Sequence, residues 1–148
     1  MNVSVNANAS CFGSANGSLS ANVLGGTPGY NYLWSNGTIS SNATGLVAGN
    51  YSVTVTDFNG CTQSAFGNIT QPSRIVVSIS RISNHNGAAI SCPGATDGAL
   101  SVSANGGTGG YTYNWSGPQN QTTANATGLA QGTYFVTVTD ASGCTASS

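Results

Sequence analysis

Short segments in which apolar and small polar residues alternate recur along this chain. In residues 51–57, YSVTVTD, the side chains of Tyr51, Val53 and Val55 point to one face of an extended strand, and serine and threonine point to the other. Residues 134–140, YFVTVTD, alternate in the same way. Turn-forming pairs such as NG and GG separate these segments, and no segment has the apolar period of a helix. The pattern therefore predicts an all-β protein.

The second half of the chain repeats the first. GGTPGYNYLWSNG at 25–37 corresponds to GGTGGYTYNWSGP at 106–118. TGLVAGNYSVTVTDFNGC at 44–61 corresponds to TGLAQGTYFVTVTDASGC at 127–144. The offset between the copies grows between these two blocks, so the second copy has the longer loop there, where added length costs little.

This repeat predicts two small domains, residues 1–71 and 73–148, with a junction near Gln71–Ser73. Pro72 lies at the junction, and a proline interrupts strand pairing because it has no N–H group. The second copy stops at GCTASS, where the first continues through AFGNITQ. We therefore expect the closing strand of the second domain to be truncated.

Seven or so short strands per domain, separated by turns, predict a β-sandwich, and two features favour the immunoglobulin-like type. Trp34 and Trp115 follow a glycine turn and lie within a strand, where such folds pack a central tryptophan. Tyr51 and Tyr134 open a later strand after Leu-x-x-Gly, which is typical of a tyrosine corner. We expect these four aromatic side chains to have structural roles in two tandem immunoglobulin-like sandwiches.

Charged residues make up only 3% of the sequence, and the net charge is −1, whereas ordinary soluble domains carry about 25% charged residues. Binding of phosphate groups requires clustered lysine and arginine, so a nucleic-acid partner is not expected. An anionic lipid surface would also require a basic patch. No run of apolar residues approaches the ~20 that a membrane-spanning helix needs, so membrane insertion is not expected either.

The four cysteines are even in number and recur with the repeat, which predicts disulfides in an oxidising, extracellular setting. We expect the pairs Cys11–Cys61 and Cys92–Cys144, each within its own domain. Pairing across the domains and four free cytosolic thiols stay open as alternatives. A zinc site is not expected, because there is no CxxC pair. The opening MNVSVNANAS does not resemble a signal peptide, so we expect a mature form or an excerpt of a longer protein.

Few residues are suited to catalysis. His85 is the only histidine, and we interpret it as a solvated loop residue because the sequence places no nucleophile and acid beside it. Asp57 and Asp140 occupy equivalent hairpin positions, and we interpret both as turn residues that accept backbone N–H bonds. Calcium ligation is the less favoured alternative for them. Asp97 also reads as a turn residue. No enzyme activity, metal site or cofactor is expected.

Taken together, these motifs resemble a known family. A cysteine followed by NGSLSANVLGGTPGYNYLWSNG and then GLVAGNYSVTVTDFNGC resembles the SprB-type repeat of large cell-surface adhesins of gliding Bacteroidetes. The resemblance covers most of both copies and departs from the pattern at TGGY and SGPQNQTTANATG in the second. It implies an extracellular stalk of sandwich modules, exported by the type IX pathway and used for surface attachment and gliding, without catalytic residues.

Three functions remain open at this point. The first is a structural or adhesive module of a cell-surface adhesin or fibre, with neighbouring repeats, copies of itself and surface polysaccharide as partners. The second is a self-assembling filament subunit in which NVSVNANA of the next copy completes the shortened sandwich. The third is a carbohydrate-binding module, for which the aromatic residues outside the core faces are Phe12, Phe58, Phe66 and Phe135.

Overall fold

The computed structural model describes residues 1–117 and 120–148. Pro118 and Gln119 belong to the longer loop of the second copy and lie outside the described residues. The chain divides into two compact units, Met1–Pro72 and Ser73–Ser148. Strands are the regular structure of the described residues, which confirms the predicted all-β class. Among those residues there is no helix with the length and apolar character needed to span a membrane.

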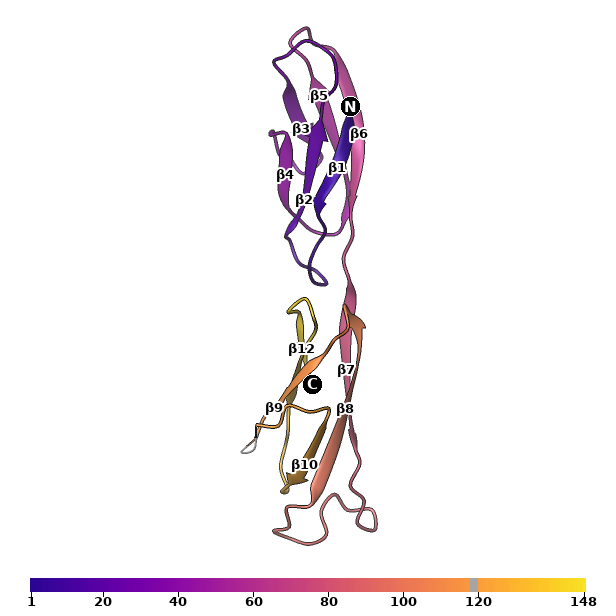
Figure 1. Ribbon diagram of the computed structural model, residues 1–148, viewed down its shortest axis with the longest axis vertical. Helices are drawn as coiled ribbons and strands as arrows, with labels where there is room; N and C mark the ends of the chain where they lie inside the picture. Colours follow the sequence, from indigo (N-terminus) through magenta and orange to yellow (C-terminus); the bar gives the residue numbers. More distant parts are fainter. Residues whose placement is uncertain (118–119) are drawn as a thin grey trace. The chain divides into compact units, whose positions relative to one another are not determined.

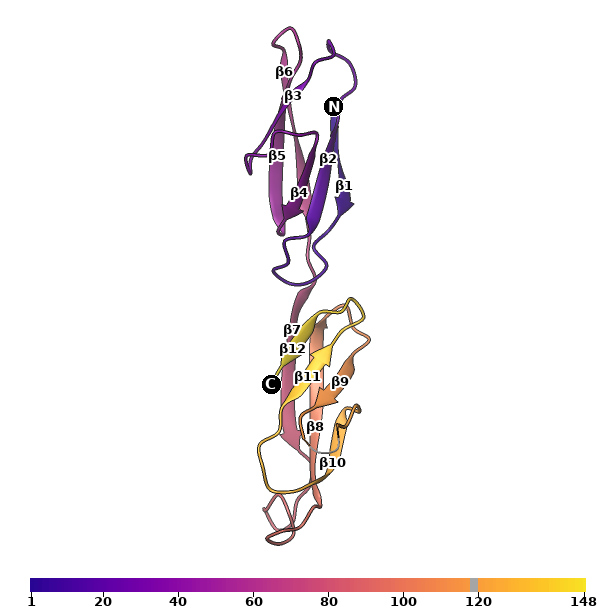
Figure 2. The same ribbon diagram turned by 90° about the vertical axis from the view of Figure 1, so that its left-hand side faces the viewer.

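Unit 1 is a sandwich of two three-stranded antiparallel sheets (Figures 1 and 2). One sheet has the strand order β1-β2-β4, and the other has the order β3-β5-β6. The strands are β1 Asn2–Ala7, β2 Gly17–Asn22, β3 Asn31–Trp34, β4 Asn42–Leu46, β5 Gly49–Thr56 and β6 Thr62–Ile69.

Unit 2 repeats this arrangement with strands β7 to β12. Its two sheets have the orders β7-β8-β10 and β9-β11-β12. Each strand therefore occupies the place of the strand six numbers earlier in unit 1. The strands are β7 Ser73–Arg81, β8 Gly98–Gly107, β9 Thr112–Trp115, β10 Asn125–Leu129, β11 Val136–Thr139 and β12 Thr145–Ser147.

The strand order confirms the immunoglobulin-like prediction. In that fold the first, second and fifth strands (A, B and E) share one sheet, and the strands C, F and G form the other. Both units have this division, with β1 and β7 in the place of strand A and β6 and β12 in the place of strand G. Unit 1 differs from the expected seven or so strands, since residues 35–41 between β3 and β4 form turns and bends where a strand D would lie.

The core of each unit consists of the inward-facing residues of both sheets. In unit 1 Trp34 on β3 lies opposite Val53 on β5, and their exposed fractions are 1% and 0%. In unit 2 Trp115 and Val136 form the equivalent pair, with 3% and 0% exposed. Alternate residues on each strand face the opposite sheet, so the apolar positions of the alternating pattern are buried together. The buried residues of the unit 1 core are Ala9, Leu19, Ala21, Trp34, Ala43, Leu46, Val53, Val55 and Ile69.

The two ends of unit 1 carry different loops. The β1–β2 loop lies at one end and the β5–β6 hairpin at the other in both views (Figures 1 and 2). Hydrogen bonds fasten the β1–β2 loop to the chain that leaves the unit: Ala9 N donates to Thr70 O at 3.0 Å, and Gly13 N donates to Gln71 Oε1 at 2.7 Å. We call this end the exit end of the unit, and we call the hairpin end its entry end.

The entry end of each unit holds the start of its first strand beside the hairpin. In unit 1, Met1 and Cys61 line the same small surface cavity. In unit 2, Ser73 at the start of β7 is paired with Gly107, and the next residue, Thr108, donates its N–H to Asp140 in the β11–β12 hairpin at 2.9 Å. The chain therefore enters each sandwich beside this hairpin and, in unit 1, leaves it beside the β1–β2 loop.

Candidate functional site

A single carboxylate organises the entry end of unit 1. Asp57 lies at the start of the turn between β5 and β6. Its Oδ1 accepts hydrogen bonds from the backbone N–H groups of Asn59 and Cys61, both at 2.9 Å, and its Oδ2 accepts one from Thr27 N at 3.0 Å. The side chain therefore closes its own turn and also ties the hairpin to the glycine-rich loop before β3.

Asp140 makes the same three bonds in unit 2. Its Oδ1 accepts from the N–H groups of Ser142 and Cys144, both at 2.9 Å, and its Oδ2 accepts from Thr108 N. Asp140 is only 5% exposed. The repetition of all three contacts explains why both copies of the sequence contain GGT and, further along, DxxGC.

The second position of each GGT motif must be glycine, because a side chain there would collide with the aspartate carboxylate. Gly107 has φ of +61°, and a Cβ atom added to it would lie 2.4 Å from Asp140 Oδ2 and 2.9 Å from Ile75 Cγ1. Gly26 has φ of +76°, and a Cβ there would lie 3.2 Å from Asp57 Oδ2. Side chains rarely adopt such φ values, and here they would also meet the aspartate.

Hydrogen bonds from the backbone lower the pKa of both carboxyl groups. The N–H of Thr27 is the largest cause of the lowered pKa of Asp57, and the N–H of Thr108 is the largest cause for Asp140. The partners that face these carboxylates are N–H donors, whereas a calcium ion would require oxygen ligands around it. The described residues contain no group of three or more His, Cys, Asp or Glu side chains that could hold a metal ion.

The tryptophan and tyrosine side chains bind the backbone of their own units. Trp34 Nε1 donates to Ser40 O at 2.9 Å, and Trp115 Nε1 donates to Thr123 O at 2.9 Å. Tyr51 Oη donates to Val47 O at 3.0 Å, four residues upstream, which is the geometry of a tyrosine corner. These polar contacts let large amphipathic side chains be buried without leaving a donor unpaired.

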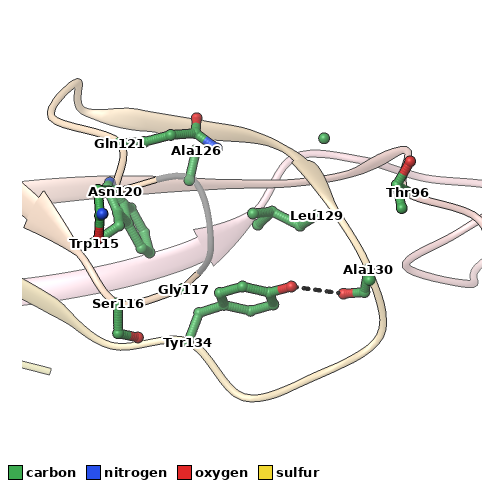
Figure 3. Close-up of a pocket in the computed structure, with 11 residues that line it drawn as sticks. Thr96, Trp115, Ser116, Gly117, Asn120, Gln121, Ala126, Leu129, Ala130 and Tyr134 are labelled. Carbon is green, nitrogen blue, oxygen red and sulfur yellow. Dashed lines mark hydrogen bonds between the residues drawn. The ribbon is translucent and has the colours of Figure 1, made fainter.

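Figure 3 shows the cavity between the corresponding residues of unit 2. Tyr134 crosses it and donates from its Oη to Ala130 O at 3.1 Å, with Trp115 and Leu129 also on its lining. Its volume is about 100 Å³, well below the ~300 Å³ at which sites for small organic ligands begin. We interpret it as a packing gap beside the tyrosine corner.

His85 and Asp97 lie close together in unit 2, which the sequence did not predict. His85 Nε2 lies 3.6 Å from Asp97 Oδ2 in the β7–β8 loop. Asp97 Oδ1 accepts the N–H of Ser91 at 3.0 Å, as Asn16 accepts that of Ser10 in unit 1. The hydrogen bond from the Ser91 side chain is the largest cause of a lowered pKa at Asp97. Asp97 thus holds the β7–β8 loop in place. The neighbouring histidine has no counterpart in the first copy of the repeat.

Comparison with known proteins supports the repeat and its type. The family model of the SprB repeat matches residues 3–39 and 90–120, which include the first cysteine and the tryptophan of each unit. The family model is thus found at two regions of this chain, one in each unit. A search of curated proteins gave no match.

Solved structures of immunoglobulin-domain proteins are also similar to this chain. The amphioxus IgVJ-C2 molecule is 16% identical and covers 92% of this chain and 94% of its own, with a TM-score of 0.37. Dpr11 IG1 bound to DIP-gamma IG+IG2 is 12% identical, covers 99% and 95%, and has a TM-score of 0.31. DIP-gamma IG1+IG2 is 12% identical, covers 100% and 95%, and has a TM-score of 0.29.

The state of the cysteines in the two units differs from the expected pairing. Cys61 and Cys92 are free, exposed thiols, whereas Cys11 and Cys144 are disulfide-bonded. The expected pairs Cys11–Cys61 and Cys92–Cys144 therefore do not form.

The physical reason is the length of the sandwich. In each unit the first cysteine lies in the loop after the first strand, and the second lies in the last hairpin, at the opposite end. In unit 1 the eight residues of β6 separate those ends, which is about 26 Å at ~3.3 Å per residue. A disulfide requires Cα atoms within about 7 Å of each other. The sequence places each pair within one domain, but only the strand order shows which end of the sandwich each cysteine occupies.

The close approach of glycine and aspartate gives a test with a matched control. Gly109 also has a positive φ, of +74°, but a Cβ there would meet nothing within 4 Å. Gly109→Ala should cost about 1 kcal/mol from backbone strain alone. Gly107→Ala should destabilise unit 2 clearly more, because Asp140 must move and lose its bond to Thr108. Urea unfolding of both variants measures the difference, and equal losses would contradict a steric role for the aspartate.

Acid should weaken both units through the same carboxylates. Because the pKa values of Asp57 and Asp140 are lowered on folding, their contribution to stability is fully present above the ordinary value of 3.8. It is lost as pH falls through the lower values of the folded state. Thermal unfolding followed by circular dichroism should give a constant Tm from neutral pH to about pH 5 and a fall below about pH 4. The double variant Asp57→Asn/Asp140→Asn should have a lower Tm at neutral pH and a shallower acid dependence, and an unchanged slope would refute the assignment.

Proposed function

We propose that this chain is a structural segment of an extracellular cell-surface adhesin or fibre of the SprB type. The observation that carries the proposal is the direct succession of two sandwiches of one design. β6 of unit 1 ends at Ile69 and β7 of unit 2 begins at Ser73, so only three residues lie between the last strand of one repeat and the first strand of the next. This arrangement suits a chain that extends by adding identical modules.

The surface chemistry of unit 1 supports a spacer role. On the sheet β1-β2-β4, exposed asparagine and serine side chains bond across the strands: Asn6 Nδ2 donates to Ser20 Oγ at 2.5 Å, and Ser20 Oγ donates to Asn42 Oδ1 at 2.6 Å. These groups satisfy one another without charge. A surface of this kind remains hydrated and exerts little long-range attraction on ions or charged partners.

The exposed aromatic residues favour a spacer over a carbohydrate-binding module. Phe12 lies in the loop at the exit end of unit 1, and Phe58 lies in the hairpin at its entry end. Phe66 is 77% exposed on β6 between these ends. A platform that stacks on a sugar needs its rings side by side, and in unit 1 Phe12 and Phe58 are at opposite ends of the sandwich.

Labelling of intact cells tests the proposed location. An antibody raised against this chain should label unpermeabilised cells of a strain that produces it, and protease treatment of those cells should remove the signal. An antibody against a cytoplasmic protein is the control and should label cells only after permeabilisation. Labelling by the first antibody only after permeabilisation would contradict an extracellular role.

A further inference from the structure

Each unit has one cysteine in the loop after its first strand and one in its last hairpin. In unit 1, Cys11 lies in the exit-end loop, which is bonded to Gln71 through Gly13 N. In unit 2, Cys144 lies in the entry-end hairpin, and its N–H is bonded to Asp140. Only Pro72 separates Gln71, which is fastened to unit 1, from Ser73, which is paired within unit 2.

We propose that the first cysteine of each SprB repeat forms a disulfide with the second cysteine of the repeat that follows it. Within this chain the bond joins Cys11 to Cys144, the two disulfide-bonded cysteines, and it leaves Cys61 and Cys92 as the free thiols. Cys61 is then the attachment point for the first cysteine of a preceding repeat. Cys92 is the attachment point for the second cysteine of a following repeat.

The exposure of the free thiols agrees with this role. Cys61 occupies the hairpin position of Cys144, and Cys92 occupies the loop position of Cys11. Both are solvent-exposed, whereas Cys144 is 8% exposed. The hairpin thiol is held in place by the Asp57 bond to Cys61 N at 2.9 Å, as Asp140 holds Cys144. A fixed hairpin presents its thiol in a constant direction, which lowers the entropy lost when the bond forms.

The bond forms by exchange with an oxidised dithiol carrier of the extracytoplasmic space. The Cys11 thiolate attacks the carrier disulfide, which gives a mixed disulfide and releases one carrier thiol. The Cys144 thiolate then attacks the Cys11 sulfur and displaces the second carrier thiol. One S–S bond forms in the protein and one is reduced in the carrier, and the two electrons and two protons of the cysteines pass to the carrier.

Trypsin provides a direct test, because Arg74 and Arg81 are the chain's only cleavage sites. Protein made in an oxidising compartment is alkylated in denaturant to block free thiols and is then digested. Residues 1–74 and 82–148 should remain one covalent species without reductant and should separate after reduction. Alkylation should be found on Cys61 and Cys92 only. Fragments that separate without reductant, or alkylation of all four cysteines, would overturn the proposal.

Single serine variants supply the controls for this digest. Cys11→Ser and Cys144→Ser should each abolish the link between the fragments. Cys61→Ser and Cys92→Ser remove a thiol of the same type and should leave the link intact. The linkage of the fragments is measured in denatured protein. The result therefore depends on which sulfur atoms were joined and not on how stable each variant is. The result is also independent of cell-surface labelling, so its failure would leave the proposed spacer function standing.

A fusion tests the extension to further repeats. Two copies of the chain are joined by a copy of residues 66–72, which supplies the end of a closing strand and the linker. Cys92 of the first copy should then be linked to Cys61 of the second, and both should be protected from alkylation. Alkylation at both positions in the fusion would show that the bond is confined to Cys11 and Cys144 and would overturn the general rule.

Discussion

The constraint on which this structure depends is that an immunoglobulin-like sandwich has two ends, joined by extended strands. The loop after the first strand belongs to one end, and the last hairpin belongs to the other. Strands such as β6, of eight residues, hold these ends about 26 Å apart. Cysteines placed in those two loops therefore cannot meet inside one unit. The aspartate–glycine contact fixes one of the two loops in each copy.

Disulfides between repeats would change how such a chain carries tension. With such bonds at both ends of unit 1, tension would pass from its entry end to its exit end through residues 1–11 and residues 61–72. These segments contain β1 and β6, which are already extended. An extended strand gains little length when pulled, because its rise of ~3.3 Å per residue is close to the maximum of the chain. Bonds at both ends of a repeat would thus shield residues 12–60, which form most of the core, from the load.

The fold could be predicted from the alternation of apolar and polar residues, from the turn residues and from the internal repeat. The strand YSVTVTD and its equivalent show their buried face directly in sequence, and Leu-x-x-Gly before Tyr51 and Tyr134 indicates the corner that their hydroxyls form. The disulfide pairing could not be derived in this way. The recurrence of two cysteines in each domain favours internal pairs, and only the assignment of loops to ends of the sandwich excludes them. The contact of Gly107 with Asp140 could not be predicted from the sequence either, because the two residues lie far apart in the chain.

The separation of the two cysteines within one sandwich tests the account most directly. Nitroxide spin labels on Cys11 and Cys61, in the variant Cys92→Ser/Cys144→Ser, report this distance by pulsed electron paramagnetic resonance. The chain from Cys61 to Gln71 at the exit end is nearly all strand, so the expected separation is about 30 Å at ~3.3 Å per residue. A distance distribution centred below about 15 Å would place both cysteines at one end of the sandwich. That result would contradict the account and restore pairing within each repeat.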